Sequence, residues 1–453
     1  MAAGAPPSPR FESDKEDGED SKTRKLIFEG LDAAAKCEGV DVDKRMLEGR
    51  KANRGFTISA GTSADPDFSS LRNSKRAQTL PADCSRRGDF EMSEDSKKQL
   101  EEMQKHLLAR YRHGSVSVVF DVVPQEVLDE TFKNKVVGHS HGIITEGQQH
   151  GDERERVSYG TIPLDPPPLI ACQKGCKGFK DTSPNQDNFS ITHFKSGYTL
   201  ICTFDGHGPF GHIVSTRTVQ TVPWFMVNES GFGNDTINEA DIEKALINAF
   251  EKAQKDVVAH SLENDWDVQA SGSTAVAALF KGNKVWTANA GDSRCAIGSE
   301  ADKKVIFETE DHKPQTEKEQ SSNRVHGRRS SLADVPGRMG EPPHLHQGQG
   351  DYPGLCMART LGDQSVKDHG VCATPEVALT TVDLSKKVFF IIASDGVWEF
   401  LDSQFVVKAV AKKIQSDGPA KTLEKLQREA KKRWKAEEGD YCDDITSVLV
   451  QLR

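Results

Sequence analysis

Hydrophobic residues recur at strand-like and helical intervals over the C-terminal two thirds of the chain. Apolar runs predict six strands, at residues 198–204, 273–280, 284–290, 293–297, 388–393 and 447–452. Apolar residues at helical spacing predict helices at 241–260, 404–414 and 419–434. The three strands between residues 273 and 297 have links too short for helical crossovers, so we expect them to pair as hairpins. Antiparallel strands with separate long helices indicate the α+β fold class.

The first part of the chain has a different character. Residues 1–90 are rich in charge, Ser, Gly and Pro, a composition that predicts disorder. Residues 91–160 form an N-terminal extension, with a helical pattern at 93–112 and a strand-like run at 115–123, to which we assign no role. We place a globular domain at 161–453, entered through a proline-rich linker.

Charge and cysteine usage limit the classes of partner. The chain has 59 Lys and Arg against 69 Asp and Glu, a net charge of -10, which argues against nucleic acid or an anionic membrane as partner. No apolar run reaches the ~18 residues that span a bilayer. Nine dispersed cysteines indicate reduced thiols and a cytoplasmic or nuclear location. Cys172 and Cys176 have loosely zinc-like spacing, but no second pair completes four ligands.

Aspartates stand at the ends of the predicted strands: Asp187, Asp205, Asp292, Asp363, Asp395, Asp443 and Asp444. Turn chemistry explains any one of them, because Asp-Gly pairs favour turns. Ionised carboxylates are costly to cluster, however, unless a cation neutralises them. Oxygen ligands without a His/Cys set favour Mg²⁺ or Mn²⁺ over zinc. Two such ions about 3.5–4 Å apart activate a water molecule and hold a phosphoryl group, so the pattern predicts phosphate-ester hydrolysis.

A glycine-rich segment at residues 206–211 offers a competing interpretation. It follows a strand and satisfies Gly-x-Gly-x-x-Gly, the pattern of dinucleotide-binding loops. Pro209 has no N–H to give to a pyrophosphate. Asp205 would also place negative charge where a helix N-terminus should attract the phosphate. A nucleotide-binding oxidoreductase is therefore a distant alternative, which cofactor titration would test.

The region from about Gly175 to the end of the chain contains a series of short motifs: SPNQD at 183–187, DGHG at 205–208, SGSTA at 271–275, ANAGDSR at 288–294, DHKP at 311–314, ARTLGD at 358–363, PEV at 375–377, SDGVWE at 394–399 and DDIT at 443–446. In these motifs and in their order, the chain resembles the type 2C family of metal-dependent serine/threonine protein phosphatases. The resemblance implies a sandwich of two antiparallel β-sheets flanked by α-helices, with 161–453 as the catalytic domain and 315–354 as a flap. It implies hydrolysis of phosphoserine and phosphothreonine in proteins by direct attack of a dimetal-bound water.

The same resemblance implies two Mg²⁺ or Mn²⁺ ions per active site and a weaker third. Asp205 is the expected bridge between the two ions, and the carbonyl of Gly206 a further ligand. Asp363 and Asp443 are expected to bind the first metal. Asp292 is expected to hold the third metal together with Asp363.

Three further residues take roles from the resemblance. Asp187 is expected to hydrogen-bond a metal-bound water. His207 is expected to be the general acid that protonates the leaving seryl or threonyl oxygen, with a structural histidine as the alternative. Asp395 is either an acid that supports the metal ligands or a turn residue at a strand end.

The chain departs from the family pattern near its first acidic motif. Gln186 replaces the usual Glu, and a neutral amide is a poorer ligand, so the second metal would bind more weakly or through water. Thr182 stands where the family often has an arginine that grips the substrate phosphate. Lys177 and Lys180 offer positive charge instead, as point charges rather than a bidentate fork, with solvated loop lysines as the alternative. Asp444 replaces a common Asn, with little expected effect.

A pseudophosphatase that binds or scaffolds partners is the main rival function. Gln186 and Thr182 support it, whereas Asp205, Asp363 and Asp443 argue against it, because a binding module has no need of clustered ligand acids. Metal-dependent hydrolysis of p-nitrophenyl phosphate would separate the two. As a phosphatase, the chain is expected to act as a monomer on phosphorylated proteins.

The flap adds weaker signals. It contains three histidines that are too loosely spaced to indicate a metal site, so we favour solvated loop residues over metal ligands: His326, His344 and His346.

Two short segments resemble sites for basophilic kinases, residues 328–331 in the flap and residues 76–79 in the N-terminal part of the chain. Phosphorylation of Ser331 would add negative charge near the substrate entrance.

Overall fold

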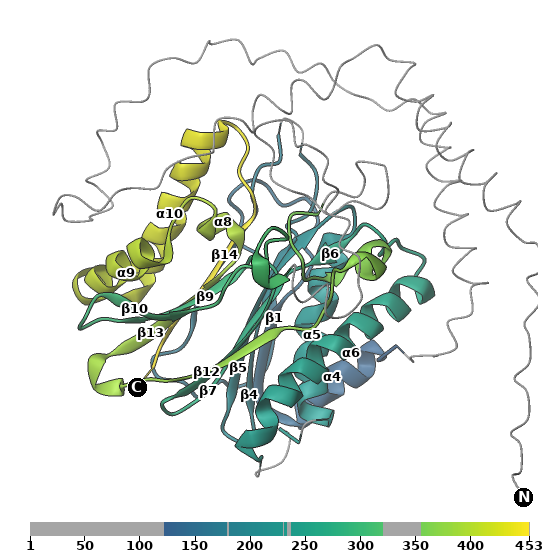
Figure 1. Ribbon diagram of the computed structural model, residues 1–453, viewed down its shortest axis with the longest axis horizontal. Coiled ribbons are helices and arrows are strands. Elements are labelled where there is room, and N and C mark those ends of the chain that lie inside the picture. Colours follow the sequence, from purple (N-terminus) through teal and green to yellow (C-terminus); the bar gives the residue numbers. More distant parts are fainter. Residues whose placement is uncertain (1–121, 179–180, 230, 233–236, 320–354, 453) are drawn as a thin grey trace, which may run out of the picture. The chain divides into compact units, whose positions relative to one another are not determined.

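The computed structural model describes residues 122–178, 181–229, 231–232, 237–319 and 355–452, and the fold is given for these ranges. Two antiparallel sheets lie face to face with helices on their outer sides (Figure 1). This arrangement confirms the predicted α+β sandwich. Among the helices of these ranges, none has the length and apolar character needed to cross a bilayer.

The first sheet has nine strands, in the order β12-β8-β7-β5-β4-β1-β2, with β6 paired to β5 and to β11 beside this path. The strands are β1 (Val136–Gly142), β2 (Arg156–Gly160), β4 (Asp187–Phe194), β5 (Thr199–His207), β6 (Gly272–Ser273), β7 (Ala275–Lys281), β8 (Lys284–Ala290), β11 (Leu361–Gly362) and β12 (Glu376–Thr381). Its outer face is covered by α4 (Gln125–Asn134), α5 (Gly211–Glu229) and α6 (Ile242–Glu263).

The second sheet has five strands, in the order β10-β9-β13-β14-β3. These are β3 (Leu169–Gln173), β9 (Arg294–Ser299), β10 (Lys304–Glu308), β13 (Val388–Ala393) and β14 (Ile445–Gln451). Its outer face is covered by α8 (Asp395–Trp398), α9 (Ser403–Asp417) and α10 (Pro419–Glu438). Short 3-10 turns complete the described elements: η2 (Glu239–Asp241), η3 (Gln364–His369) and η4 (Leu384–Lys386).

Three apolar cores correspond to the layers. The core between the sheets joins Ile201 and Val276 of the first sheet to Phe390 and Val448 of the second. A second core packs α5 and α6 on the first sheet, and a third packs α9 and α10 on the second. Most strands are therefore buried on both faces, and this explains why they read as continuous apolar runs.

Local sequence signals fix the ends of the second sheet's helices. Asp402 caps α9 by accepting a hydrogen bond from Phe405 N at 2.8 Å. Pro419 begins α10 at a position where its missing N–H costs nothing. These two helices and α6 confirm the three helices predicted from apolar spacing.

The predicted pairing of 284–290 with 293–297 is wrong. β7 and β8 form the expected hairpin, but β8 pairs next with β12, whereas β9 pairs with β10 and β13 in the second sheet. The chain changes sheets at Gly291, whose φ of 123° suits only glycine. A Cβ atom there would also lie 2.7 Å from Thr274. The crossing leaves Asp292 between the two sheets.

The first sheet continues N-terminally of residue 161, the boundary expected from the sequence. β1 pairs with β4, and β2 pairs with β1. Leu128 and Phe132 of α4 are buried in the core outside this sheet. The domain division stays a prediction. The expected disorder at 1–90, the helix at 93–112 and nearly all of the strand at 115–123 lie outside the described residues.

Candidate metal centre

Acidic residues from both sheets meet at one end of the sandwich. Asp187 begins β4 and stands directly opposite Asp205 on β5. Asp292 lies at the crossing from β8 to β9. Asp395 follows β13 as the first residue of α8, and Asp443 lies two residues before β14. Because neighbouring strands run antiparallel, the start of one lies beside the end of the next, and this brings residues that are far apart in sequence to the same end of the sandwich.

Asp187 is fully enclosed at this edge. Its Oδ2 accepts a hydrogen bond from Ser394 Oγ at 2.6 Å, and its N–H donates to Asn185 Oδ1 at 2.9 Å. Burial, and after it the charge of Asp444, raises the pKa of Asp187 to about 7. The Ser394 hydrogen bond acts against this rise but does not cancel it.

Asp205 and Asp395 form the centre of the negative charge. Burial raises the pKa of Asp205 well above its usual value, and the charges of Asp395, Asp187, Asp443 and Asp292 add to the rise in that order. Burial, followed by Asp443 and Asp292, also raises the pKa of Asp395, although it shares a hydrogen bond with Asp205. Such a cluster is stable only when bound protons or cations compensate its negative charge.

His207 and Asp363 form a separate pair beside the cluster. His207 Nε2 lies 2.8 Å from Asp363 Oδ2. Burial acts to lower the pKa of His207, but the charge and hydrogen bond of Asp363 outweigh burial and raise it above the usual value. His207 correspondingly overcomes the burial of Asp363 and lowers its pKa.

The short strand β6 holds this pair together. Gly272 is paired with His207 on β5 and with Gly362 on β11. A Cβ atom at Gly272 would lie 2.0 Å from Asp363 Oδ2 and 2.7 Å from His207 Nε2, so only glycine fits. Asp363 itself adopts a left-handed conformation with φ of 45°, an uncommon backbone state that is often found at functional sites.

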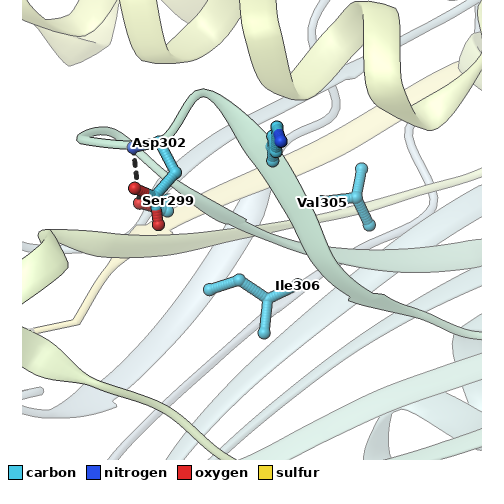
Figure 2. Close-up of a pocket in the computed structure, with 5 residues that line it drawn as sticks. Ser299, Asp302, Val305 and Ile306 are labelled. Atoms are coloured by element: carbon cyan, nitrogen blue, oxygen red, sulfur yellow. Dashed lines mark hydrogen bonds between the residues drawn. The ribbon is translucent and has the colours of Figure 1, made fainter.

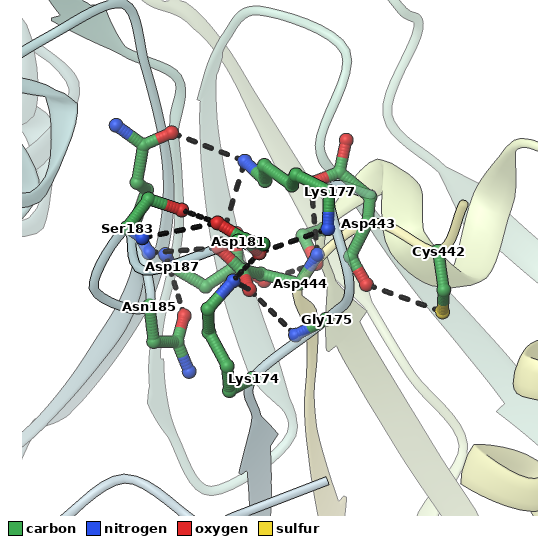
Figure 3. A network of polar contacts seen from close by, with 12 residues as sticks. Lys174, Gly175, Lys177, Asp181, Ser183, Asn185, Asp187, Cys442, Asp443 and Asp444 are labelled. Atoms are coloured by element: carbon green, nitrogen blue, oxygen red, sulfur yellow. Dashed lines mark hydrogen bonds and ion pairs between the residues drawn. The ribbon is translucent and has the colours of Figure 1, made fainter. Parts of the chain in front are cut away.

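Lys177 reaches the cluster from the loop after β3 (Figure 3). Its Nζ lies 3.1 Å from Asp443 Oδ1 and donates to Gln186 Oε1, also at 3.1 Å. The amide nitrogen of Gln186 donates to Gly208 O at 2.7 Å. Burial acts to lower the pKa of Lys177, but Asp443 and Asp444 raise it well above the usual value. The ammonium group is therefore a fixed positive charge within the cluster.

A buried lysine that the motifs did not reveal balances Asp444 (Figure 3). Lys174 is 1% exposed, and its Nζ lies 2.7 Å from Asp181 Oδ2 and 3.6 Å from Asp444 Oδ1. Asp444 accepts hydrogen bonds from the N–H groups of Gly175 at 2.6 Å and Gln186 at 2.8 Å. Asp444 therefore ties the loop after β3 to the first acidic motif.

Two buried polar atoms in the described ranges have no hydrogen-bond partner at this site. Asp292 Oδ2 accepts from Lys313 Nζ at 2.5 Å, but its Oδ1 is unpartnered. The Nδ1 atom of His207 is also unpartnered. A buried carboxylate oxygen without a donor is a free ligand for a cation.

Arg154 is a second residue that sequence reasoning missed. It precedes β2 and is 6% exposed. Its Nη1 donates to the carbonyl oxygens of Asn185 at 2.8 Å and Asp187 at 2.7 Å, and its Nη2 donates to Thr216 Oγ1 at 2.9 Å. This guanidinium positions the main chain on which Asp187 stands. A lone arginine outside any motif gives no signal in the sequence.

The donor set fits hard divalent cations, since it consists of carboxylate oxygens with an excess of negative charge. As the side chains stand, no group of three or more His, Cys, Asp or Glu in the described ranges is close enough to hold an ion. Two of the expected metal ligands already have an ion-pair partner: Lys177 contacts Asp443, and His207 contacts Asp363. Of the expected site residues, Asp187, Asp205, Asp292 and Asp443 lie in the cluster, whereas Asp363 pairs with His207 beside it.

Some expected site features fall outside the described ranges. Lys180, the three histidines of the flap, Ser331 and all of the flap beyond residue 319 belong to them. The zinc-like spacing of Cys172 and Cys176 does not correspond to a shared site. Cys172 Sγ accepts hydrogen bonds from Thr446 Oγ1 at 3.0 Å and Asn185 Nδ2 at 3.7 Å, whereas Cys176 stands opposite Cys442.

A pocket of about 380 Å³ lies away from the acids, on the hairpin of β9 and β10 (Figure 2). It is lined by Ser299, Asp302, Lys304, Val305 and Ile306. The backbone N–H of Asp302 donates to Ser299 Oγ at 3.0 Å and closes the turn. None of these five residues belongs to the acidic cluster, and they offer no reactive constellation.

Comparisons with known proteins agree with the geometry. Residues 170–438 match the family model described as "Protein phosphatase 2C". The chain is 33% identical over 289 residues to "Probable protein phosphatase 2C 64" of Oryza sativa subsp. japonica, covering 62% of this chain and 65% of that one. It is 31% identical over 346 residues to "Probable protein phosphatase 2C 35" of Arabidopsis thaliana, covering 70% of this chain and 93% of the relative.

Among solved structures, the chain is similar to a serine-threonine phosphatase 2C from Toxoplasma gondii. The similarity covers 69% of this chain and 99% of that one, at 17% identity and a TM-score of 0.47.

Proposed function

The chain belongs to the protein phosphatase 2C family, and on this premise we propose that it hydrolyses phosphoserine and phosphothreonine in proteins with two bound Mg²⁺ or Mn²⁺ ions. One observation carries the proposal. Asp205 lies at the centre of a cluster of buried and half-buried acids, in which four other acids, from the strand ends of both sheets, raise its pKa. A protein keeps such repulsion within its fold when cations relieve it.

Asp205 would hold both ions, because the charges of Asp395, Asp187, Asp443 and Asp292 all act on it. Asp443 and Asp363 would complete the coordination of the first ion, and the unpartnered Oδ1 of Asp292 would be available to a weaker third ion. When bound, the divalent cations supply Lewis-acid activation of water for attack on phosphorus and neutralise the phosphoryl charge. For Asp443 to act as a ligand, its carboxylate must turn away from Lys177.

His207 supplies the proton that the leaving oxygen requires. Its pairing with Asp363 favours the protonated imidazole, which is the form that a general acid needs. His207 is a quarter exposed at its side chain, so an approaching substrate can meet the ring. Asp187 is fully enclosed, and its carboxylate is suited to orienting a water rather than to touching the substrate.

Lys177 would bind the substrate phosphate after it releases Asp443. Its side chain is 24% exposed, and its ammonium group lies at the edge of the acids. Lysine offers a point charge and not a bidentate fork, so phosphate binding should be weaker than with arginine. A Lys177→Arg variant should therefore lower KM for a phosphopeptide, and Lys177→Met should raise it.

The deciding experiment measures hydrolysis of p-nitrophenyl phosphate and of a phosphothreonine peptide in Mn²⁺, in Mg²⁺ and in EDTA. We expect turnover that needs a divalent ion and that falls more than about 100-fold in Asp205→Asn, beyond the usual cost of losing an outer-sphere partner of a metal site. Asp302→Asn, an exposed acid paired with Lys386, is the matched control and should keep full activity. A wild-type chain without metal-dependent turnover would favour the pseudophosphatase alternative.

A further inference from the structure

Two cysteines stand directly opposite each other beside the candidate metal centre. Cys176 and Cys442 form an antiparallel bridge outside the named strands. The N–H of Cys176 donates to Cys442 O at 2.7 Å, and the N–H of Cys442 donates to Cys176 O at 2.8 Å. Both residues carry free thiols. The two reciprocal bonds fix the relative position of the two main chains.

This geometry places the two thiols within reach of each other. Residues that exchange both hydrogen bonds in an antiparallel pair have Cα atoms about 5.5 Å apart and side chains on the same face. Disulfides span Cα separations of about 4.4–6.8 Å. Both thiols must rotate to meet, since Cys442 Sγ points to Asp443 O at 3.4 Å and Cys176 Sγ to Gly178 O at 3.8 Å.

Each cysteine is the immediate neighbour of a residue of the site. Cys176 precedes Lys177, and Cys442 precedes Asp443, and these two neighbours are themselves joined at 3.1 Å. Figure 3 shows Cys442 next to Asp443 and Lys177 in the same network. A disulfide brings the Cβ atoms to about 3.8 Å, whereas an open pair of this type holds them about 4.5–5.5 Å apart. Closing the bond would therefore move the main chain that carries Lys177 and Asp443.

We propose that Cys176 and Cys442 are a site of reversible oxidation, at which a peroxide forms a disulfide that disturbs the metal centre and slows its reaction. Cys176 is the more exposed thiol, so its sulfur meets the oxidant first and becomes a sulfenic acid, with one water released. The sulfur of Cys442 then displaces the hydroxyl as a second water. Two thiols lose two electrons and two protons in total, and one hydrogen peroxide is reduced to two waters.

Peptide mapping tests the bond itself. Full-length protein is treated with hydrogen peroxide in Mg²⁺, cleared with catalase, alkylated and digested without reductant. Mass spectrometry should find the Cys176 and Cys442 peptides joined, two hydrogens lighter than their sum, and separate after dithiothreitol. Cys176→Ser should abolish the joined peptide, while Cys372→Ser, a partly buried thiol elsewhere, should keep it. Recovery of both thiols in alkylated form, or of Cys176 as sulfinic acid alone, would overturn the proposal.

Two further readouts test the consequence, and this part rests on the proposed function. The oxidised chain should lose at least about half of its Mn²⁺-induced rise in Tm and turn over p-nitrophenyl phosphate several-fold more slowly, with both recovered by dithiothreitol. Cys176→Ser should show neither change. A joined peptide with an unaltered metal response would contradict the effect on the site. If the reduced chain has no activity, the proposed function fails, but the mapping and the metal response still decide this proposal.

Discussion

The carboxylate of Asp187 on the first sheet accepts a hydrogen bond of 2.6 Å from the Oγ of Ser394, which directly follows β13 of the second sheet. Ser394 also accepts a hydrogen bond from Thr446 N at 3.0 Å, so the link extends to β14. The acidic cluster is thus attached to both sheets by a buried, short contact. Because the contact is enclosed, its strength depends on whether Asp187 carries a proton.

Asp187 should make the stability of the metal-free protein depend on pH in a specific way. Its pKa is raised to about 7, chiefly by burial, so its contribution to stability is complete below about pH 4 and is lost as the pH rises to about 7. Asp187→Asn lacks this loss. In EDTA, the Tm of Asp187→Asn minus that of wild type should therefore grow from pH 4 to pH 7 and then level.

In saturating Mn²⁺ at pH 7, the Tm of wild type should instead exceed that of Asp187→Asn, because metal binding needs the deprotonated carboxylate. Thermal unfolding monitored by circular dichroism measures both arms. A Tm difference in EDTA that does not change between pH 4 and pH 7 would contradict the raised pKa of Asp187.

His207→Gln should separate the two kinds of substrate. A phosphothreonine peptide has a poor leaving group, so loss of a general acid should lower its kcat by about 100-fold or more. p-Nitrophenolate leaves without a proton, so kcat for p-nitrophenyl phosphate should fall far less. Steady-state kinetics on both substrates, in the same Mn²⁺ buffer, gives the ratio. Equal losses on the two substrates would assign His207 a structural role.

Arg154→Met should weaken the fold and the site together. It leaves the buried carbonyl oxygen of Asn185 without a donor and that of Asp187 with only the weak thiol donor of Cys172, and an unsatisfied buried group costs about 1–3 kcal/mol. We expect the free energy of unfolding to fall by about 2–4 kcal/mol and the affinity for Mn²⁺ to fall with it. Arg156→Met, an exposed arginine on β2, is the matched control and should change neither. Urea unfolding and Mn²⁺ titration measure the two effects.

Truncation should distinguish two N-terminal limits. A chain that begins at Thr161 lacks α4, β1 and β2, so it exposes the edge of β4 and the apolar face that Leu128 and Phe132 cover. Such an open edge favours aggregation. We expect this chain to be insoluble or to unfold without cooperativity, whereas a chain that begins at residue 122 should show a cooperative thermal transition. A soluble and active chain from Thr161 would assign the three elements a dispensable role.

The sequence placed the acids correctly at strand ends, because apolar runs that are buried on both faces end sharply where the chain returns to a polar edge. Asp292, Asp363, Asp395 and Asp443 all lie just outside a strand, and Asp205 lies within the last residues of β5. The family motifs supplied their expected roles, which the geometry alone does not assign.

Other features of the fold had no readable signal. α5 contains Pro223 and many β-branched residues, which lower helix propensity, and it is held by packing on the first sheet. Its buried Thr218 and Thr221 return their hydroxyls to the carbonyls of Val214 and Arg217. The change of sheet at Gly291 was missed because a short link ordinarily makes a hairpin. Lys174 and Arg154 act through tertiary contacts that no local pattern records.

The core between the sheets has a consequence for residues that touch no acid. Asp187 and Asp205 lie in strands of one sheet, and Asp395 and Asp443 lie next to strands of the other, so the thickness of that apolar layer sets the gap between the two halves of the site. Phe280 and Phe390, whose rings meet edge to face at 5.4 Å, are part of the layer that sets this thickness. Shortening either ring should therefore change the spacing of these acids, although both rings belong to the core between the sheets and not to the acidic cluster.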